Sequence, residues 1–143
     1  MTIRHLTTFV ALLLAACFAS AQEKPVVKKG PIKQTSPASG KEMYTEYCAA
    51  CHGADGKGTG PAAAALKAPP ADLTTLAKRS EGGKYPRDHV ANLLRERKGA
   101  LAHGSSDMPT WGSLFKSLEP NHDIVVQQLI KNLNDYLASL QEK

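Results

Sequence analysis

The sequence is poor in cysteine and in aromatic residues. Only 3 of its 143 residues are cysteine, and phenylalanine, tyrosine and tryptophan together make up 6% of the chain. So few cysteines exclude the disulfide framework that holds small secreted domains together. The length suits one domain of ordinary size, and the shortage of large apolar side chains leaves that domain with little core of its own.

A strong excess of charge of either sign is also absent. The formal net charge is +5 at pH 7, and the basic residues are scattered along the chain. A protein that binds nucleic acid usually carries a denser basic patch, so nucleic acid is not expected as a partner. A mildly basic surface is suited to docking on an acidic face of another protein.

The sequence has no apolar run long enough to span a membrane comfortably. The apolar run at 6–18 is followed by small residues at 19–21, which predicts a signal peptide over residues 1–21. Residues 14–17 also resemble a bacterial lipobox, in which Cys17 would be lipidated and would tether the protein to the membrane. Both alternatives place the folded domain outside the cytoplasm, in the periplasm.

A flexible linker is expected to follow the export signal. Residues 22–38 carry three prolines and four lysines and little that could be buried. The folded domain is then expected over residues 39–143. No stretch of this domain alternates apolar and polar residues as a strand would, so the expected fold class is all-α.

About four or five helices are expected, because capping residues precede stretches with apolar residues at helical spacing. Ser39 and Asp72 are candidate N-caps, and Pro86 is suited to the first turn of a helix. The helices that can be placed in this way cover residues 41–51, 73–80, 85–99 and 120–140. The loops between them, above all 53–70 and 99–112, are long for a compact domain, and a large apolar cofactor would give them something to pack on.

The motif that points to chemistry is CAACH at residues 48–52. A redox-active Cys-x-x-Cys pair normally lies at a helix start in a βαβ pattern, whereas this pair ends a helix in an all-α chain. A zinc site would need a fourth ligand, and no second pair of ligands with the usual spacing follows. The histidines that remain as candidates are His89, His103 and His122.

C-x-x-C-H is also the attachment sequence of c-type haem. Residues three and four apart share one face of a helix, so Cys48, Cys51 and His52 are expected to point to the same side. The two thiols can then bond the two vinyl groups of haem while the imidazole of His52 reaches the iron. In bacteria this attachment takes place outside the cytoplasm, in agreement with the predicted export.

Met108 is the best candidate for the second axial ligand. A buried methionine is usually core filler on a helix stripe, but Met108 lies between Asp107 and Pro109 in a segment too polar for a helix core. A thioether held in such a loop suits the distal side of a haem iron. The competing candidates are His103 and Met43.

With these residues in place, the chain resembles the class I c-type cytochromes of bacteria, in their single-haem form. The resemblance covers residues 39–143 and rests on MYTEYCAACHGADGKGTGP, on DMPTWG and on the last helix. It implies an all-α fold in which the first and last helices cross. It also implies one haem c attached to Cys48 and Cys51, with His52 and Met108 as ligands of the iron.

The resemblance implies roles for Pro61 and Trp111 as well. Pro61 matches the proline whose backbone carbonyl orients the proximal imidazole, and such a bond fixes the ring and raises its basicity. Trp111 matches an aromatic residue that often packs near a haem propionate, and packing in the core is the alternative for it.

The expected function is transfer of single electrons, because two axial ligands from the protein leave the iron no open position for a substrate. The expected partners are redox proteins with acidic docking faces. One alternative is a haem enzyme or a sensor of gas or peroxide, in which Met108 is labile or does not bind the iron. Another is a fixed subunit of a respiratory or dehydrogenase complex.

Overall fold

The computed structural model describes residues 30–96 and 108–142, and this part of the chain contains helices and no strand. The all-α fold class predicted from the sequence is confirmed. The predicted signal peptide, Cys17 and His103 lie outside the described residues. The helices are α2 (Gly40–Tyr47), α3 (Ala49–His52), α4 (Leu76–Arg79), α5 (Arg87–Glu96), α6 (Trp111–Leu118) and α7 (Asp123–Ser139), with 3₁₀ turns η2 (Ala63–Ala65) and η3 (Glu81–Gly83).

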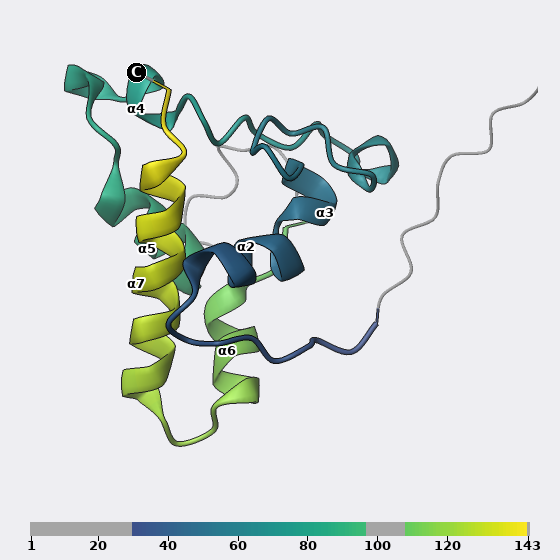
Figure 1. Cartoon of the computed structure of the whole chain (residues 1–143), viewed down its shortest axis with the longest axis vertical. Coiled ribbons are helices and arrows are strands. Elements are labelled where there is room, and N and C mark those ends of the chain that lie inside the picture. Colours follow the sequence, from purple (N-terminus) through teal and green to yellow (C-terminus); the bar gives the residue numbers. More distant parts are fainter. Residues whose placement is uncertain (1–29, 97–107, 143) are drawn as a thin grey trace, which may run out of the picture.

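The first and last helices cross, as expected (Figure 1). Ser39 caps α2 by accepting a hydrogen bond from the backbone N–H of Glu42. At Gly40 the two helices approach so closely that a Cβ atom would lie 2.8 Å from the Cβ atom of Tyr136. Only glycine fits at this crossing, because any side chain would push α2 away from α7.

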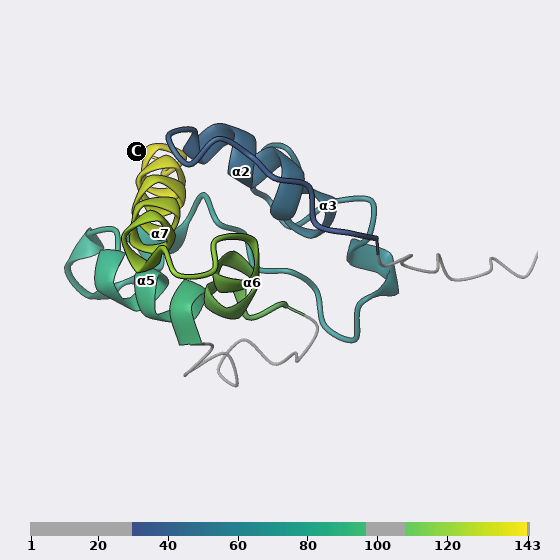
Figure 2. The same cartoon turned by 90° about the horizontal axis from the view of Figure 1, so that it is seen from below.

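The core is formed mainly by α7 together with α5 and α6, which lie beside it (Figure 2). Most of the apolar stripe predicted for the last helix is buried, and Leu140 at its end is half-buried. Val90 and Leu94 of α5 and Phe115 of α6 face the same core. The buried apolar residues of α7 are Val126, Leu129, Ile130, Leu133 and Leu137.

Helix α6 is not among the helices placed from the sequence, and its first two residues fall in the loop expected at 99–112. Trp111 and Gly112 form its first turn instead. Its apolar residues are nevertheless spaced at helical intervals, and they are Trp111, Leu114, Phe115 and Leu118. Serine and glycine between them conceal this pattern in the sequence.

Two shorter helices also differ from their predicted extent. The oxygen Oδ1 of Asp72 accepts a hydrogen bond of 2.8 Å from the N–H of Thr74, so Asp72 stabilises a turn before α4 and does not cap the helix. Helix α4 is therefore confined to Leu76–Arg79. Helix α5 begins directly after Pro86 and is described as far as Glu96.

Residues 30–38, the last part of the predicted linker, lie along the domain (Figure 1). The hydroxyl of Tyr47 donates a hydrogen bond of 2.8 Å to the carbonyl of Lys33, and Asn132 donates one of 2.7 Å to the carbonyl of Pro37. These side chains satisfy backbone groups that a linker would leave to water. In the part of the chain that is described, no helix is long and apolar enough to cross a lipid bilayer.

Candidate haem attachment site

The CAACH motif lies where α2 ends and α3 begins. Cys48 is both the C-cap of α2 and the N-cap of α3, with φ −113° and ψ −36°. Its carbonyl accepts hydrogen bonds from the N–H of Cys51 at 3.1 Å and from the N–H of His52 at 2.8 Å. The one-turn spacing that the sequence predicted for the three residues is therefore present, although the helix is interrupted at Cys48.

Both cysteines are thiols and no disulfide joins them. Cys48 belongs to the core and is 8% exposed, whereas Cys51 is half-buried. Burial raises the pKa of the Cys48 thiol to about 12, and the negative charge of Cys51 adds to this. A cysteine buried among apolar side chains is poorly placed for thiol–disulfide exchange.

Residues 30–96 and 108–142 contain no cluster of side chains that would form another metal centre. No group of three or more histidine, cysteine or acidic side chains is arranged there to hold a metal ion. His89 is exposed on α5, and His122 is exposed beside Glu119 before α7 begins. The histidines considered as a fourth zinc ligand therefore lie on the surface wherever the structure describes them.

The glycine-rich loop that follows the motif donates hydrogen bonds to the carbonyl groups at the end of α3. The last carbonyls of a helix have no partner within the helix itself. Backbone N–H groups of the loop take their place, and this docks the loop against the motif. The pairs are Ala62 N to Ala50 O at 2.8 Å, Gly60 N to Cys51 O at 3.1 Å and Gly58 N to His52 O at 2.7 Å.

Gly60 is required by this close approach. A Cβ atom there would lie 2.6 Å from the carbonyl oxygen of Ala49 and closer still to that of Ala50. Gly58 is required for a second reason, because its φ of +79° belongs to the left-handed region that favours glycine. The glycines after CAACH thus place a backbone loop directly against the helix that carries the motif.

The imidazole of His52 is half-buried and oriented by a backbone carbonyl. Its Nδ1 lies 2.9 Å from the carbonyl oxygen of Ala71. A proton on Nδ1 that is donated to this carbonyl leaves the ring lone pair on Nε2, which suits ligation of iron through Nε2. The resemblance implied the carbonyl of Pro61 as this acceptor, whereas the hydrogen bond found here goes to Ala71.

Tyr44 is a residue of this site that the sequence analysis missed. It is 1% exposed, and its hydroxyl donates a hydrogen bond of 2.6 Å to the carbonyl of Gly53, directly after His52. Burial raises the pKa of Tyr44 to about 12, and the charges of Cys48, Tyr136 and Asp55 contribute less. Its position four residues before Cys48, on the same helix face, could have revealed it.

The segment that holds Met108 leads into α6, whose first turn packs beside the motif. The ring of Trp111 lies 5.4 Å from that of Tyr47, the residue directly before Cys48, and 5.9 Å from that of Phe115. Trp111 is 6% exposed, which favours core packing, and its contact with a propionate stays a prediction. Met108 is half-buried against the same core, and its ligation of iron also stays a prediction.

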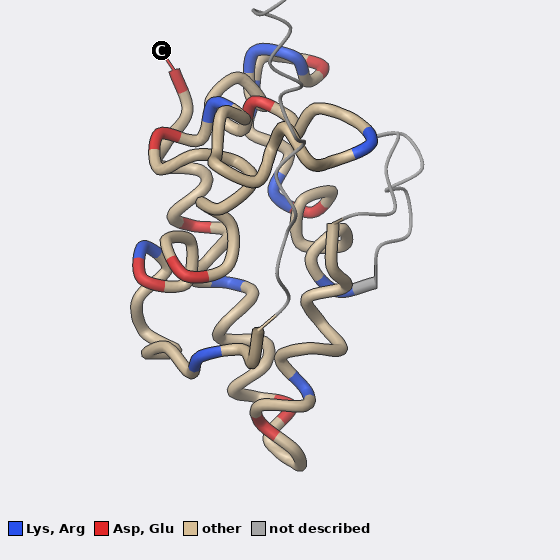
Figure 3. Tube along the Cα trace, turned by 90° about the vertical axis from the view of Figure 1, so that its right-hand side faces the viewer, with Lys and Arg blue, Asp and Glu red and all other residues tan. Residues whose placement is uncertain are grey.

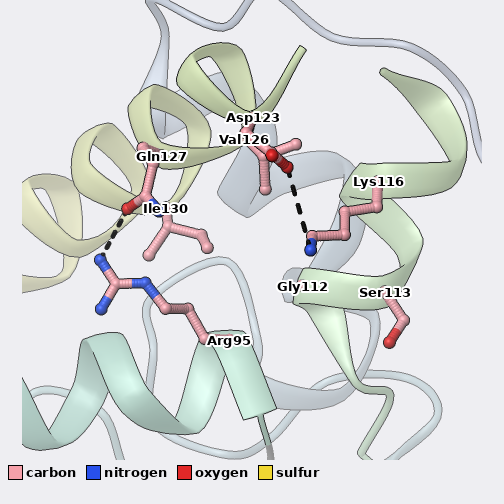
Figure 4. Close-up of a pocket in the computed structure, with 8 residues that line it drawn as sticks. All are labelled: Arg95, Gly112, Ser113, Lys116, Asp123, Val126, Gln127 and Ile130. Carbon is pink, nitrogen blue, oxygen red and sulfur yellow. Dashed lines mark hydrogen bonds and ion pairs between the residues drawn. The ribbon is translucent and has the colours of Figure 1, made fainter. Parts of the chain in front are cut away.

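An open cavity of about 370 Å³ lies between α5, α6 and α7, and none of the predicted site residues lines it (Figure 4). Arg95 donates a hydrogen bond of 2.9 Å to Gln127 at its edge, and Lys116 lies 3.9 Å from Asp123.

Charges of both signs are interspersed along the described chain, as the scattered basic residues predicted (Figure 3).

The residues present fit a covalently bound haem. Two thiols one helical turn apart can form two thioethers, and an imidazole that donates from Nδ1 to Ala71 can bind iron through Nε2. Cys48 belongs to the apolar core, so a group attached to it would have apolar surroundings. A haem c would therefore be held by Cys48, Cys51 and His52.

Comparisons with known proteins agree with this chemistry. The family model for cytochrome c oxidase, cbb3-type, subunit III matches residues 35–120, more than half of the chain. The chain is also similar to cytochrome c-551 of Bacillus subtilis (strain 168), with 25% identity over 99 residues, or 68% of this chain and 75% of that protein. No solved structure matches. The chain therefore belongs to the cytochrome family of cbb3-type cytochrome c oxidase subunit III, and it is a c-type cytochrome with covalently bound haem c.

Proposed function

We propose that this protein is an exported electron carrier whose single haem c is ligated by His52 and Met108. The hydrogen bond from Nδ1 of His52 to Ala71 supports this most directly, because it presents Nε2 as the proximal ligand. When bound, haem c supplies a one-electron couple between ferrous and ferric iron. The chain contributes a rigid frame, in which Tyr44 and the glycine loop hold the backbone on both sides of His52.

Met108 decides between a carrier and an enzyme. A thioether ligand favours ferrous iron and fills the position that a substrate, peroxide or gas would need. Its place before α6 supports this role, since α6 packs through Trp111 on the residue that precedes Cys48. The protein would then exchange electrons without binding a substrate at iron.

The proposed partners are redox proteins with acidic docking faces, met through weak and small contacts. Export through residues 1–21, with cleavage or with lipidation of Cys17, would bring the domain to such partners in the periplasm. The matched family is described as a subunit of an oxidase, whereas the curated relative is described only as a cytochrome. The alternative to a free carrier is therefore a relay subunit within a larger complex, and its electron-transfer chemistry is the same.

The test is the near-infrared spectrum of the ferric protein, produced by export in cells that attach haem c. The proposal predicts the weak band of a methionine sulfur bound to ferric iron. This band is lost in Met108→Ala and kept in Met43→Leu, a matched change of the buried methionine in α2. A ferric protein without the band, or a band that survives in Met108→Ala, would overturn ligation by Met108.

A further inference from the structure

The carbonyl that orients His52 lies in a segment without regular structure. Ala71 is followed by a turn at Asp72 and by α4 only from Leu76 onwards. A carbonyl in such a segment keeps its place only if neighbouring parts of the fold hold the backbone around it. One such hold comes from the glycine loop, because the N–H of Leu73 donates a hydrogen bond of 2.7 Å to the carbonyl of Gly56.

The second hold comes from the tail that follows α7, and it is centred on Gln141. Its Nε2 donates hydrogen bonds of 2.7 Å to the carbonyl of Leu73 and 2.8 Å to the carbonyl of Leu137. Its Oε1 accepts a hydrogen bond of 2.8 Å from the N–H of Ala77. One half-buried amide therefore joins the end of α7 to two points of the segment after Ala71.

Glu142 and Thr74 extend the same contact. The N–H of Glu142 donates a hydrogen bond of 2.8 Å to the carbonyl of Thr74. Thr74 is a buried residue, with 5% of its surface exposed. The hydroxyl of Thr74 donates a hydrogen bond of 2.6 Å to the carboxylate of Asp72, the neighbour of Ala71. The tail thus reaches the residue beside Ala71 through a continuous series of hydrogen bonds.

We propose that Gln141 is a positioning residue for the proximal ligand: it fixes the backbone of residues 71–77 and thereby the carbonyl that accepts the Nδ1 proton of His52. This inference rests on the proposed function, in which His52 binds the iron. In this role Gln141 acts through the backbone of residues 71–77. No sequence pattern indicated it, because Leu73 and Ala77 are 68 and 64 residues away along the chain.

The consequence is a change in the electronic character of the imidazole. A strong hydrogen bond from Nδ1 to a carbonyl makes the ring a better donor to iron and stabilises the ferric state. When Gln141 no longer holds Leu73 and Ala77, the Ala71 carbonyl moves more freely and this bond weakens. The ferric state then loses stabilisation, so the reduction potential rises.

The experiment compares holoprotein variants by reduction potential and by the solvent exchange rate of the His52 Nδ1 proton in the ferrous state. Gln141→Met keeps the approximate shape and removes all three hydrogen bonds, whereas Gln141→Glu keeps the acceptor and removes both donors. Gln128→Met is the matched control, because Gln128 is exposed on α7 and its side chain donates a hydrogen bond to Asn132 of the same helix. Asn134→Ala controls for lost stability, since Asn134 is buried and holds Tyr85 and the carbonyl of Arg87.

The inference predicts a higher potential and a faster exchange in Gln141→Met, with both controls unchanged. In Gln141→Glu it predicts faster exchange alone, because the added carboxylate itself lowers the potential. Unchanged potential and exchange in Gln141→Met, or an equal shift in Asn134→Ala, would overturn it. In that case an intact near-infrared methionine band would leave the proposed function standing. A wild-type spectrum that lacks histidine ligation would overturn the proposed function itself, and with it the basis of the inference.

Discussion

Replacing Gly60 by alanine tests whether the glycine loop holds the haem attachment motif. The new Cβ atom would lie 2.6 Å from the carbonyl oxygen of Ala49 and closer to that of Ala50, so the loop must move away from α3. Two backbone hydrogen bonds depend on this contact, from Gly60 N to Cys51 O and from Ala62 N to Ala50 O. Because no positive φ is involved, the effect comes from space alone.

The expected loss in the free energy of unfolding is about 2–4.6 kcal/mol. Overpacking contributes about 1–3 kcal/mol and the two hydrogen bonds about 1 kcal/mol each, and about 0.4–1 kcal/mol is regained because alanine restricts the unfolded chain. Denaturant unfolding of the holoprotein, followed by the fluorescence of Trp111, measures it. The control is Gly30→Ala, where a Cβ atom would meet nothing within 4 Å. If Gly60→Ala is as stable as this control, the loop does not hold the motif as described.

Three further predictions concern the core, the N-terminal segment and the surface. Leu133→Ala, at a residue with 0% exposure, is expected to lower the free energy of unfolding by about 2–5 kcal/mol in the same assay. Tyr47→Phe removes the hydrogen bond to Lys33, and limited proteolysis should then cut residues 30–38 faster than in the wild type. Hydrogen bonds from Lys131 and Arg87 hold the pKa of Asp135 below its ordinary 3.8. The ionised carboxylate therefore stabilises the folded protein above pH 3.8, and this stabilisation is lost as the pH falls through the lowered pKa. In Asp135→Asn the free energy of unfolding should fall less on acidification, by under about 1 kcal/mol because the Lys131–Asp135 pair is exposed. The same fall in the variant and the wild type would contradict this.

The parts of the fold with strong local signals were predictable from the sequence. The apolar spacing of α7, the cap at Ser39 and the C-x-x-C-H spacing each depend on residues within a few positions of one another. Such signals survive folding because helical geometry alone places their side chains together. The absence of strands among the described residues follows from the same lack of alternation in the sequence.

The parts that were missed depend on distant contacts. Tyr47 binds residues 30–38 through a backbone carbonyl, so nothing in their proline-rich composition shows that they lie against the domain. The acceptor for His52 is likewise a backbone carbonyl, and the identity of Ala71 carries no signal for it. Gln141 meets its partners only after α7 has crossed the domain. Backbone acceptors are present at every residue, and therefore only the fold selects among them.

The reaction of the ferrous protein with carbon monoxide tests the central claim most directly. Optical spectra of the reduced holoprotein are recorded near neutral pH before and after addition of the gas. A carrier with His52 and Met108 on the iron has no open position, so the spectrum is predicted to stay unchanged, and Met108→Ala is predicted to bind the gas. A wild-type protein that binds carbon monoxide readily would contradict the account and would indicate a sensor or an enzyme.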